Sequence, residues 1–171
     1  MKKNTNSEAG MTVWGIGPRF TVLSVGYGAV CLAVSFLFPD IFLIDFIPAW
    51  VLVLSGVLLI AAGIPFFLAS FLAVRRAYSA GKLVTRGVYR LCRHPLYASW
   101  VVFLVPGMVL IARSWLGLSV PVFMYVLLRI LVREEEAYLE NRFGEEYRAY
   151  RARVPAILPL PSAKTQPRNS G

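Results

Sequence analysis

The sequence predicts an all-α, polytopic integral membrane protein with about four transmembrane helices, a tight C-terminal hairpin and a cytosolic amphipathic tail helix. Hydrophobic residues make up 57% of the 171 residues, charged residues make up 16%, and the mean hydropathy is +0.62. This composition is too apolar for a soluble domain of this size. Four apolar stretches are close to or above the ~20 residues that a tilted helix needs to cross a bilayer. They cover residues 20–38, 48–74, 96–112 and 115–132.

Each stretch has its own features. The first follows a polar N-terminal segment and is long enough to span, so we expect a first transmembrane helix and not a cleavable signal. The second would be ~40 Å long if it were continuous, and Gly63 and Pro65 predict a kink in it. Only Arg113 and Ser114 separate the third from the fourth, which predicts an antiparallel hairpin.

The distribution of basic residues predicts the orientation. The first connection contains Asp40 and Asp45 and no basic residue. The connection after the second stretch carries Arg75, Arg76, Lys82, Arg86, Arg90 and Arg93. By the positive-inside rule we expect the N-terminus, the 75–93 loop and the C-terminus to be cytoplasmic. The net charge of +9 then reflects topology, and we expect no nucleic-acid partner.

The stretch "LCRHPLYASW", residues 91–100, contains the only histidine of the chain. Pro95 suits the first position of a helix and pushes His94 toward an extended backbone, so His94 is expected to cap the third membrane helix. The N–H groups left without partners would be those of Leu96, Tyr97 and Ala98. With Arg93 beside them, they predict an anion site. The alternative is that Arg93 reaches lipid phosphates and His94 only caps the helix.

An acidic triplet follows the fourth stretch. Helical phase predicts one apolar face from Leu128, Val132, Leu139 and Phe143. Glu135 and Glu136 fall close to the centre of that face, whereas Glu134 points away. We expect Glu136 to pair with Arg133, three residues earlier. Glu135 has no basic neighbour along the helix and therefore needs a partner from elsewhere. The alternative is a solvated acidic run at a helix end.

Aromatic residues in the tail are expected to pack the tail helix against the bundle. They are Phe143, Tyr147 and Tyr150. Tyr147 and Tyr150 could also offer hydroxyl groups to a ligand.

Several segments together resemble the C-terminal half of the isoprenylcysteine carboxyl methyltransferase family and its phospholipid methyltransferase relatives. They are Thr85, Gly87, Tyr89, "RHPLY" (93–97), the short hairpin, "EEAYL" (135–139), "FGEEYRAY" (143–150) and "VPAILP" (154–159). The resemblance covers about residues 80–160, and its specificity lies in the order of the segments. The first two membrane stretches match only in being apolar.

The resemblance implies binding of S-adenosylmethionine at the cytosolic membrane face, with a lipid-like or small hydrophobic methyl acceptor that enters from the bilayer. The cofactor-binding residues would be Tyr89, Arg93, His94, Pro95, Leu96, Tyr97, Glu135, Glu136 and Tyr147, with Arg93 and His94 also catalytic. Ala156 departs from the family, in which a basic residue often follows Val-Pro. The chain would form one methyltransferase domain, divided into an N-terminal segment (1–19), two membrane helices (20–74), a cofactor-binding core (75–160) and a disordered tail (161–171).

The foremost expectation is carboxyl O-methylation of an isoprenylcysteine-type acceptor. A carboxylate or thiolate acceptor needs no strong base, whereas an amine acceptor would need one, and His94 is the nearest candidate. Phospholipid N-methylation and thiol S-methylation therefore stay open. So do a sterol-type reductase that uses a nicotinamide cofactor and a membrane scaffold without enzymatic activity. Cys31 and Cys92 share no metal-ligand spacing, so we expect neither a disulfide nor a metal site.

Overall fold

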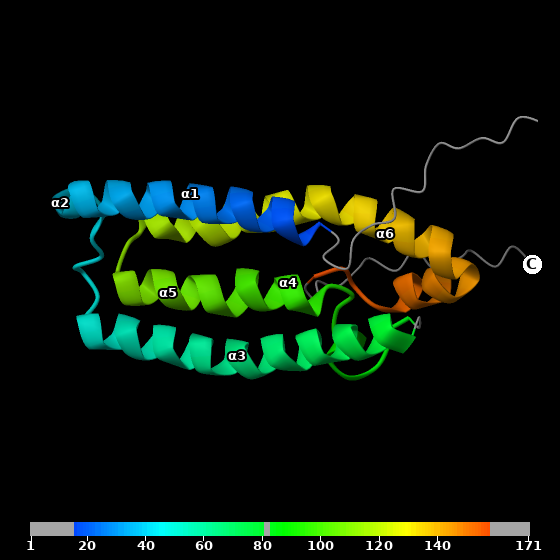
Figure 1. Ribbon diagram of the computed structural model, residues 1–171. Coiled ribbons are helices and arrows are strands. Elements are labelled where there is room, and N and C mark those ends of the chain that lie inside the picture. Colours follow the sequence, from blue (N-terminus) through cyan, green and yellow to red (C-terminus); the bar gives the residue numbers. More distant parts are fainter. Residues whose placement is uncertain (1–15, 81–82, 158–171) are drawn as a thin grey trace, which may run out of the picture.

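The computed structural model describes residues 16–80 and 83–157, which form helices and connecting turns (Figure 1). The longer helices are α1 (Gly17–Leu37), α3 (Ala49–Ala80), α5 (Val105–Ala112) and α6 (Ser119–Arg153). The shorter ones are α2 (Pro39–Phe42), η1 (Gly87–Arg90), α4 (Pro95–Ser99), η2 (Trp100–Leu104) and η3 (Leu116–Leu118). Of these, η2 is a single turn of π-helix that joins α4 to α5.

Four helical segments of the described chain are long and apolar enough to cross a membrane. They are Gly17–Leu37, Ala49–Ala77, Pro95–Ala112 and Leu116–Arg153. This result confirms the prediction of an all-α polytopic protein. The fourth apolar stretch and the tail helix prove to be one element, since α6 continues to Arg153. The predicted disordered tail, 161–171, lies outside the described residues.

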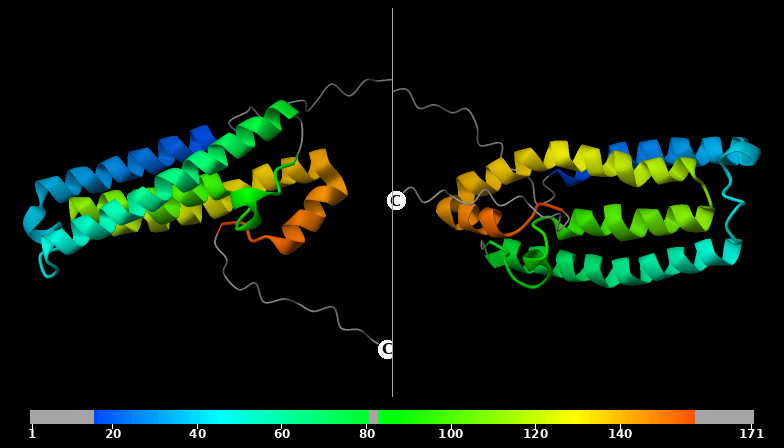
Figure 2. Two further views of the ribbon diagram at one scale, coloured as in Figure 1. Left: turned by 90° about the horizontal axis from the view of Figure 1, so that it is seen from below. Right: turned by 180° about the vertical axis from the view of Figure 1, so that it is seen from behind.

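The membrane helices form two groups. α1 packs on α6 and η3, whereas α3 packs on α4, η2 and α5. In the view of Figure 1, α4 and α5 lie between α3 and the α1–α6 pair. The other views show that the four spans run along the long direction of the bundle and that the last part of α6 turns back at one end (Figure 2).

The second stretch forms one continuous helix, α3, with Pro65 inside it. The kink at Gly63 and Pro65 stays a prediction. Gly63 lets a neighbouring helix approach. A Cβ atom on Gly63 would lie 2.7 Å from the Cβ of Phe103 and 2.9 Å from Cδ2 of Leu104, both in the π-helical turn η2. Glycine is therefore needed where this wide turn presses against α3.

The predicted hairpin between the third and fourth spans is confirmed. α5 ends at Arg113 in the left-handed conformation (φ 55°, ψ 33°), and the Oγ of Ser114 accepts a hydrogen bond of 2.9 Å from the N–H of Gly117. The N–H of Ile44 donates to the carbonyl of Arg113 (2.7 Å), and the indole N–H of Trp115 donates to the carbonyl of Ile41 (2.7 Å). The first connection therefore closes over the hairpin turn.

We expect Gly56→Val to destabilise the protein. A Cβ atom at this position would lie 2.5 Å from the carbonyl oxygen of Gly107 and 2.7 Å from Cγ1 of Ile111, so α3 and α5 would have to separate. Overpacking of this kind costs about 1–3 kcal/mol. Thermal unfolding in detergent measures the loss. Gly26→Val is the control, because a Cβ atom on Gly26 meets no atom of the described chain within 4 Å. Equal unfolding temperatures for both variants would contradict the close helix contact.

Candidate functional site

The segment 92–97 lies where the turned-back end of the chain meets the start of the third span. His94 is the residue before α4, with φ −121° and ψ 58°, and Pro95 is the first helical residue, as predicted. The anion site predicted from free N–H groups is smaller than expected, because the N–H of Ala98 donates to the carbonyl of His94 (3.0 Å). α4 itself has only five residues before the π turn begins.

The end of the chain holds this segment from the other side. The N–H of Arg93 donates to the carbonyl of Pro155 (2.9 Å), and the N–H of His94 donates to the carbonyl of Ala156 (3.0 Å). Residue 156 therefore contacts the site through its backbone. Ala156 departs from the family pattern in its side chain, and the hydrogen bond to His94 is made by its backbone, so the departure does not affect this bond.

Glu136, and not Glu135, is the buried carboxylate of the acidic triplet. Leu128, Val132 and Glu136 follow one another at intervals of four residues, and their exposed fractions are 0%, 4% and 7%. The predicted pair with Arg133 is wrong. Glu136 Oε1 lies 2.6 Å from a terminal guanidinium nitrogen of Arg93, and both side chains are at least nine-tenths buried. Glu136 lies on the inward face of α6 because it follows Leu128 and Val132 at the same four-residue spacing.

His94 lies between the two neighbouring glutamates. Its Nδ1 is 3.7 Å from Oε1 of Glu135 and its Nε2 is 3.4 Å from Oε1 of Glu136. Burial favours the neutral ring, but the two carboxylates outweigh burial and raise the pKa of His94 above its ordinary value. A neutral imidazole has one donor nitrogen, whereas an imidazolium has two. The geometry therefore favours a protonated His94 that donates toward both carboxylates.

Glu135 retains capacity to bind a ligand. Its side chain is 22% exposed, and it accepts one hydrogen bond from the hydroxyl of Tyr97, at 3.4 Å. Tyr97 is held in turn by Phe20 of α1, whose ring meets it edge-on with centroids 5.4 Å apart. The predicted partner of Glu135 is thus Tyr97 together with His94. Arg93 of the loop binds Glu136.

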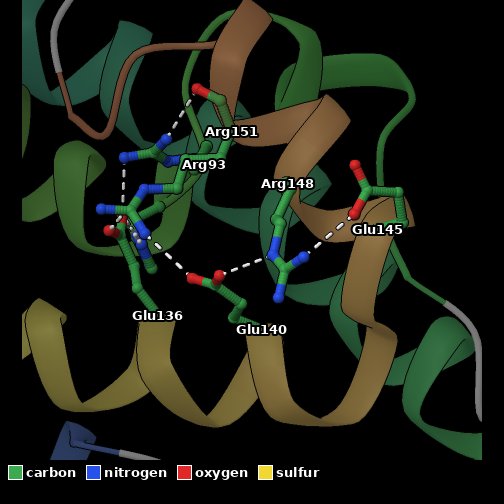
Figure 3. Close-up of polar contacts among 7 residues, drawn as sticks. Arg93, Glu136, Glu140, Glu145, Arg148 and Arg151 are labelled. Atoms are coloured by element: carbon green, nitrogen blue, oxygen red, sulfur yellow. Dashed lines mark hydrogen bonds and ion pairs between the residues drawn. The ribbon is translucent and has the colours of Figure 1, made fainter.

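The last part of α6 turns back over the site at Gly144, where φ is 53° and ψ is −125°. L-residues rarely adopt this conformation, so the turn depends on glycine. After it, Arg148 and Arg151 both pair with Glu140 of the preceding turns (2.8 and 3.1 Å). Figure 3 shows these side chains meeting between the straight and the turned-back parts of α6. The turn was not predicted from the sequence, although a glycine inside a charged helix is a signal for one.

The turned-back segment also supplies contacts to the site. The carbonyl of Arg151 accepts a hydrogen bond from Arg93 (2.9 Å), and its guanidinium lies 3.7 Å from Glu136. The predicted packing of Tyr147 and Tyr150 is confirmed, since both are buried. The hydroxyl of Tyr150 donates to the carbonyl of Tyr89 (2.7 Å). Arg151 was not among the predicted site residues, because its role depends on the turn at Gly144.

Two buried polar atoms at the site have no hydrogen-bond partner among the described residues. They are the hydroxyl of Tyr147, which belongs to a fully buried side chain, and Nε of Arg93. Unpaired buried groups are costly, and a native structure keeps few of them. Tyr147, Arg93 and Glu135 line the same cavity, so a polar ligand bound there could pair with these atoms.

A cavity of about 1100 Å³ connects the polar site to the apolar space between the helices. Seven of the nine predicted site residues line it, namely Tyr89, Arg93, His94, Leu96, Tyr97, Glu135 and Tyr147. Pro95 and Glu136 do not line it; both are buried and shape the site from behind. From Tyr97 the cavity extends along α1 as far as Cys31 and Leu32, with apolar side chains of α3 and α5 on its other walls.

Both cysteines are buried free thiols. Burial raises the pKa of Cys92 to about 11, so this side chain stays protonated at neutral pH. Among residues 16–80 and 83–157, no group of three or more His, Cys, Asp or Glu side chains is placed to hold a metal ion.

Comparison with known proteins gives one family. The profile of the phospholipid methyltransferase family matches residues 49–146. Over 78 residues, or 46% of this chain, the sequence is 39% identical to the protein-S-isoprenylcysteine O-methyltransferases of Mus musculus and Homo sapiens. It is 33% identical over 79 residues to protein-S-isoprenylcysteine O-methyltransferase B of Arabidopsis thaliana. The matched part spans 28% of each mammalian relative and 40% of the plant relative. No solved structure matches the chain significantly.

Glu136→Gln is expected to destabilise the ligand-free protein. The substitution leaves the buried guanidinium of Arg93 without its carboxylate, and breaking a buried ion pair in this way costs about 3–5 kcal/mol. Chemical or thermal unfolding in detergent gives the difference. Glu134→Gln is the matched control, since that side chain is 63% exposed and its ion pair within the described residues is with the exposed Arg19. A loss in the control as large as that in Glu136→Gln would contradict the assignment of the buried pair.

The raised pKa of His94 predicts that the stability of the protein depends on pH. Its pKa is higher in the folded than in the unfolded protein, so its contribution is complete below the unfolded value of about 6.5 and is lost as the pH rises through the folded value. The unfolding temperature should therefore fall on the alkaline side of this window. In His94→Gln this fall should be absent. A wild-type protein that becomes more stable as the pH rises above 6.5, with no such rise in His94→Gln, would contradict a protonated His94.

Proposed function

The chain belongs to the phospholipid methyltransferase family, and on this premise we propose that it is an S-adenosylmethionine-dependent methyltransferase that methylates the carboxylate of an amphiphilic, isoprenylcysteine-type acceptor. Membership rests on the family profile, which covers more than half of the chain. The matched relatives carry this activity in their names. Because the matched part spans less than half of each of them, substrate and activity are proposals for this chain.

The single observation that carries the proposal is the continuity of the cavity. Its polar end contains Glu135, Arg93, His94 and Tyr147, and its other walls are apolar side chains of the membrane helices. An amphiphile with a charged head and a hydrocarbon tail fits this division. Its tail would lie between α1 and α3, which pack on different partners. Burial of a hydrocarbon chain in that space would contribute to binding and would leave the head beside the polar residues.

The unpaired atoms of the site fit the polar groups of the proposed methyl donor. The hydroxyl of Tyr147 and Nε of Arg93 would donate to its carboxylate or ribose oxygens, and the carboxylate of Glu135 would accept from its ammonium or hydroxyl groups. When bound, the cofactor supplies an electrophilic methyl group for in-line displacement. The chain contributes alignment of the two reactants and exclusion of water by the turned-back segment.

The surroundings of His94 favour a carboxylate acceptor over an amine. Both ring nitrogens face carboxylate oxygens, so a protonated His94 has no free lone pair with which to take a proton from an amine. A carboxylate attacks a methyl group without losing a proton, and a thiol that is already ionised does the same. We therefore assign His94 to positioning of the two glutamates, with proton abstraction as the role that fits an amine acceptor less well.

The proposed orientation places this site at the cytoplasmic face. The polar end of the cavity lies beside the basic loop that follows α3 and the basic end of α6, where Arg151 and Arg153 lie in the last turn. The positive-inside rule assigns such segments to the cytoplasm. In this orientation the N-terminus, the 75–93 loop and the C-terminus are cytoplasmic.

Ligand titration of the purified protein tests the proposal. S-adenosylmethionine should bind, and the reduced nicotinamide cofactor should not. Tyr147→Phe should weaken S-adenosylmethionine about three- to tenfold, the effect of one lost hydrogen bond. It should leave the unfolding temperature unchanged or higher, because its hydroxyl has no partner in the described chain. Tyr150→Phe is the matched control. It should lower the unfolding temperature and leave the affinity for S-adenosylmethionine unchanged, because the hydroxyl of Tyr150 already donates to the carbonyl of Tyr89.

Methylation of an isoprenylcysteine by the wild-type protein should give a product that mild alkali hydrolyses, because a methyl ester is labile to base and a methylated amine or thioether is not. Binding of the nicotinamide cofactor alone would favour a reductase. Binding of neither ligand would favour a scaffold.

A further inference from the structure

Tyr138 and Arg142 form a pair of polar side chains on the wall of the cavity, and neither belongs to the site residues predicted from the sequence. Nη1 of Arg142 donates to the hydroxyl of Tyr138 at 2.9 Å. The central guanidinium carbon lies 5.6 Å from the centroid of the Phe143 ring, which is within the range of a cation–π contact. Phe143 lines the cavity too, so both neighbours hold the guanidinium beside it.

This pair keeps hydrogen-bond donors that no described residue uses. A guanidinium has five N–H donors, and one of those of Arg142 binds Tyr138. The tyrosine hydroxyl accepts that bond, so its own proton is left to be donated. Among the described residues no carboxylate pairs with Arg142, whereas Arg148 of the same helix pairs with Glu140 at 2.8 Å. The pair is therefore equipped to bind an anion.

Glu135 and Arg142 lie on the same face of α6. They are seven residues apart, so at ~100° per residue their directions from the helix axis differ by only about 20°. At ~1.5 Å per residue they are about 10 Å apart along the helix. Both line the cavity, with Tyr138 between them in the sequence. This face therefore offers a carboxylate for a cation and, two turns further on, a guanidinium for an anion.

The two reactants of the proposed methyl transfer carry charges in the same order. The methyl donor has a sulfonium and an ammonium group, and the acceptor has a carboxylate. In the transfer a carboxylate oxygen forms a bond to the methyl carbon as the bond from that carbon to sulfur breaks, the electron pair of the broken bond stays on sulfur, and no proton moves. If Glu135 holds the cationic reactant, Tyr138 and Arg142 are placed to hold the anionic one.

We propose that Tyr138 and Arg142 bind the carboxylate of the acceptor and select it over the methyl ester that the reaction produces. The inference rests on the proposed function and names the residues that recognise the acceptor head. Arginine commonly pairs with a carboxylate through two parallel hydrogen bonds. Methylation removes the negative charge and leaves only neutral acceptor oxygens, so the product binds this pair more weakly than the substrate does. The pair thus strengthens substrate binding and favours product release.

Equilibrium binding of N-acetyl-S-farnesylcysteine and of its methyl ester tests the proposal. Each is titrated into the protein in nanodiscs of zwitterionic lipid, with S-adenosylhomocysteine present so that no methyl group is transferred. Arg142→Gln should weaken binding of the acid about five- to tenfold, between the effects of a charged hydrogen bond and of an exposed ion pair, and should leave binding of the ester unchanged. Tyr138→Phe should give a smaller loss of the same kind. Arg133→Gln is the matched control, because Arg133 is an exposed residue of α6 that does not line the cavity.

Steady-state kinetics provide a second readout. The attraction between Arg142 and the acceptor declines as the ester forms, so it stabilises the bound substrate at least as much as the transition state. Arg142→Gln should therefore raise KM for the acid and leave kcat unchanged or higher. The affinity for S-adenosylmethionine should not change. A loss of that affinity would assign the pair to the methyl donor and overturn the proposal.

Two further outcomes would overturn acceptor recognition by this pair. One is an equal loss of affinity for the acid and the ester in Arg142→Gln, because a contact with the carboxylate must distinguish the two. The other is a change that appears only in nanodiscs that contain phosphatidylglycerol, because Arg142 would then bind lipid phosphates. In either case, methylation of the acid by the wild-type protein would leave the proposed function intact.

Discussion

The ion pair between Arg93 and Glu136 is the contact on which the arrangement of the site depends. It joins the loop before the third span to the fourth helix, at 2.6 Å and with both side chains almost fully buried. A buried ion pair contributes little net stability compared with apolar packing, but loss of either partner leaves a charge that water cannot reach. The pair therefore acts mainly to fix geometry. Once Arg93 and Glu136 are together, His94 must lie between Glu136 and Glu135, and the cavity receives its polar end.

The turn at Gly144 brings the end of the chain onto that pair. Without a residue at positive φ, α6 would continue straight, and neither Arg151 nor the carbonyls of Pro155 and Ala156 would reach the 93–94 segment. The turned-back segment covers charges that would otherwise face solvent, which strengthens their interaction by lowering the local dielectric. It also fixes Tyr147 beside the cavity without giving its hydroxyl a partner. One glycine near the end of the chain thus controls the burial of charges that lie fifty residues earlier in the sequence.

The spans and the hairpin were predictable from the sequence, because apolar length and the short connection at Arg113 and Ser114 act locally. The meeting of the segment before Pro95 with the acidic triplet was also predictable, and the structure brings the two together. The assignment among the glutamates was not, because Glu135 and Glu136 differ by only one helical position and Arg93 could not be placed from the sequence. Gly63 shows the same limit. A glycine close to a proline predicts a kink, but nothing in the sequence indicates that this glycine also admits the π-helical turn of a different helix.

The charge balance of the site connects its geometry to its chemistry. Glu136 pairs with Arg93 and with the more distant Arg151, and the two glutamates together raise the pKa of His94. A site arranged in this way stabilises a carboxylate at position 135 without consuming all of its hydrogen-bonding capacity, since Tyr97 donates only one bond to it. The remaining capacity is free for a cationic or hydroxylated group, while both ring nitrogens of His94 face carboxylate oxygens. The proposed carboxyl methylation agrees with this arrangement, because a carboxylate attacks a methyl group without losing a proton and so asks for no base at His94.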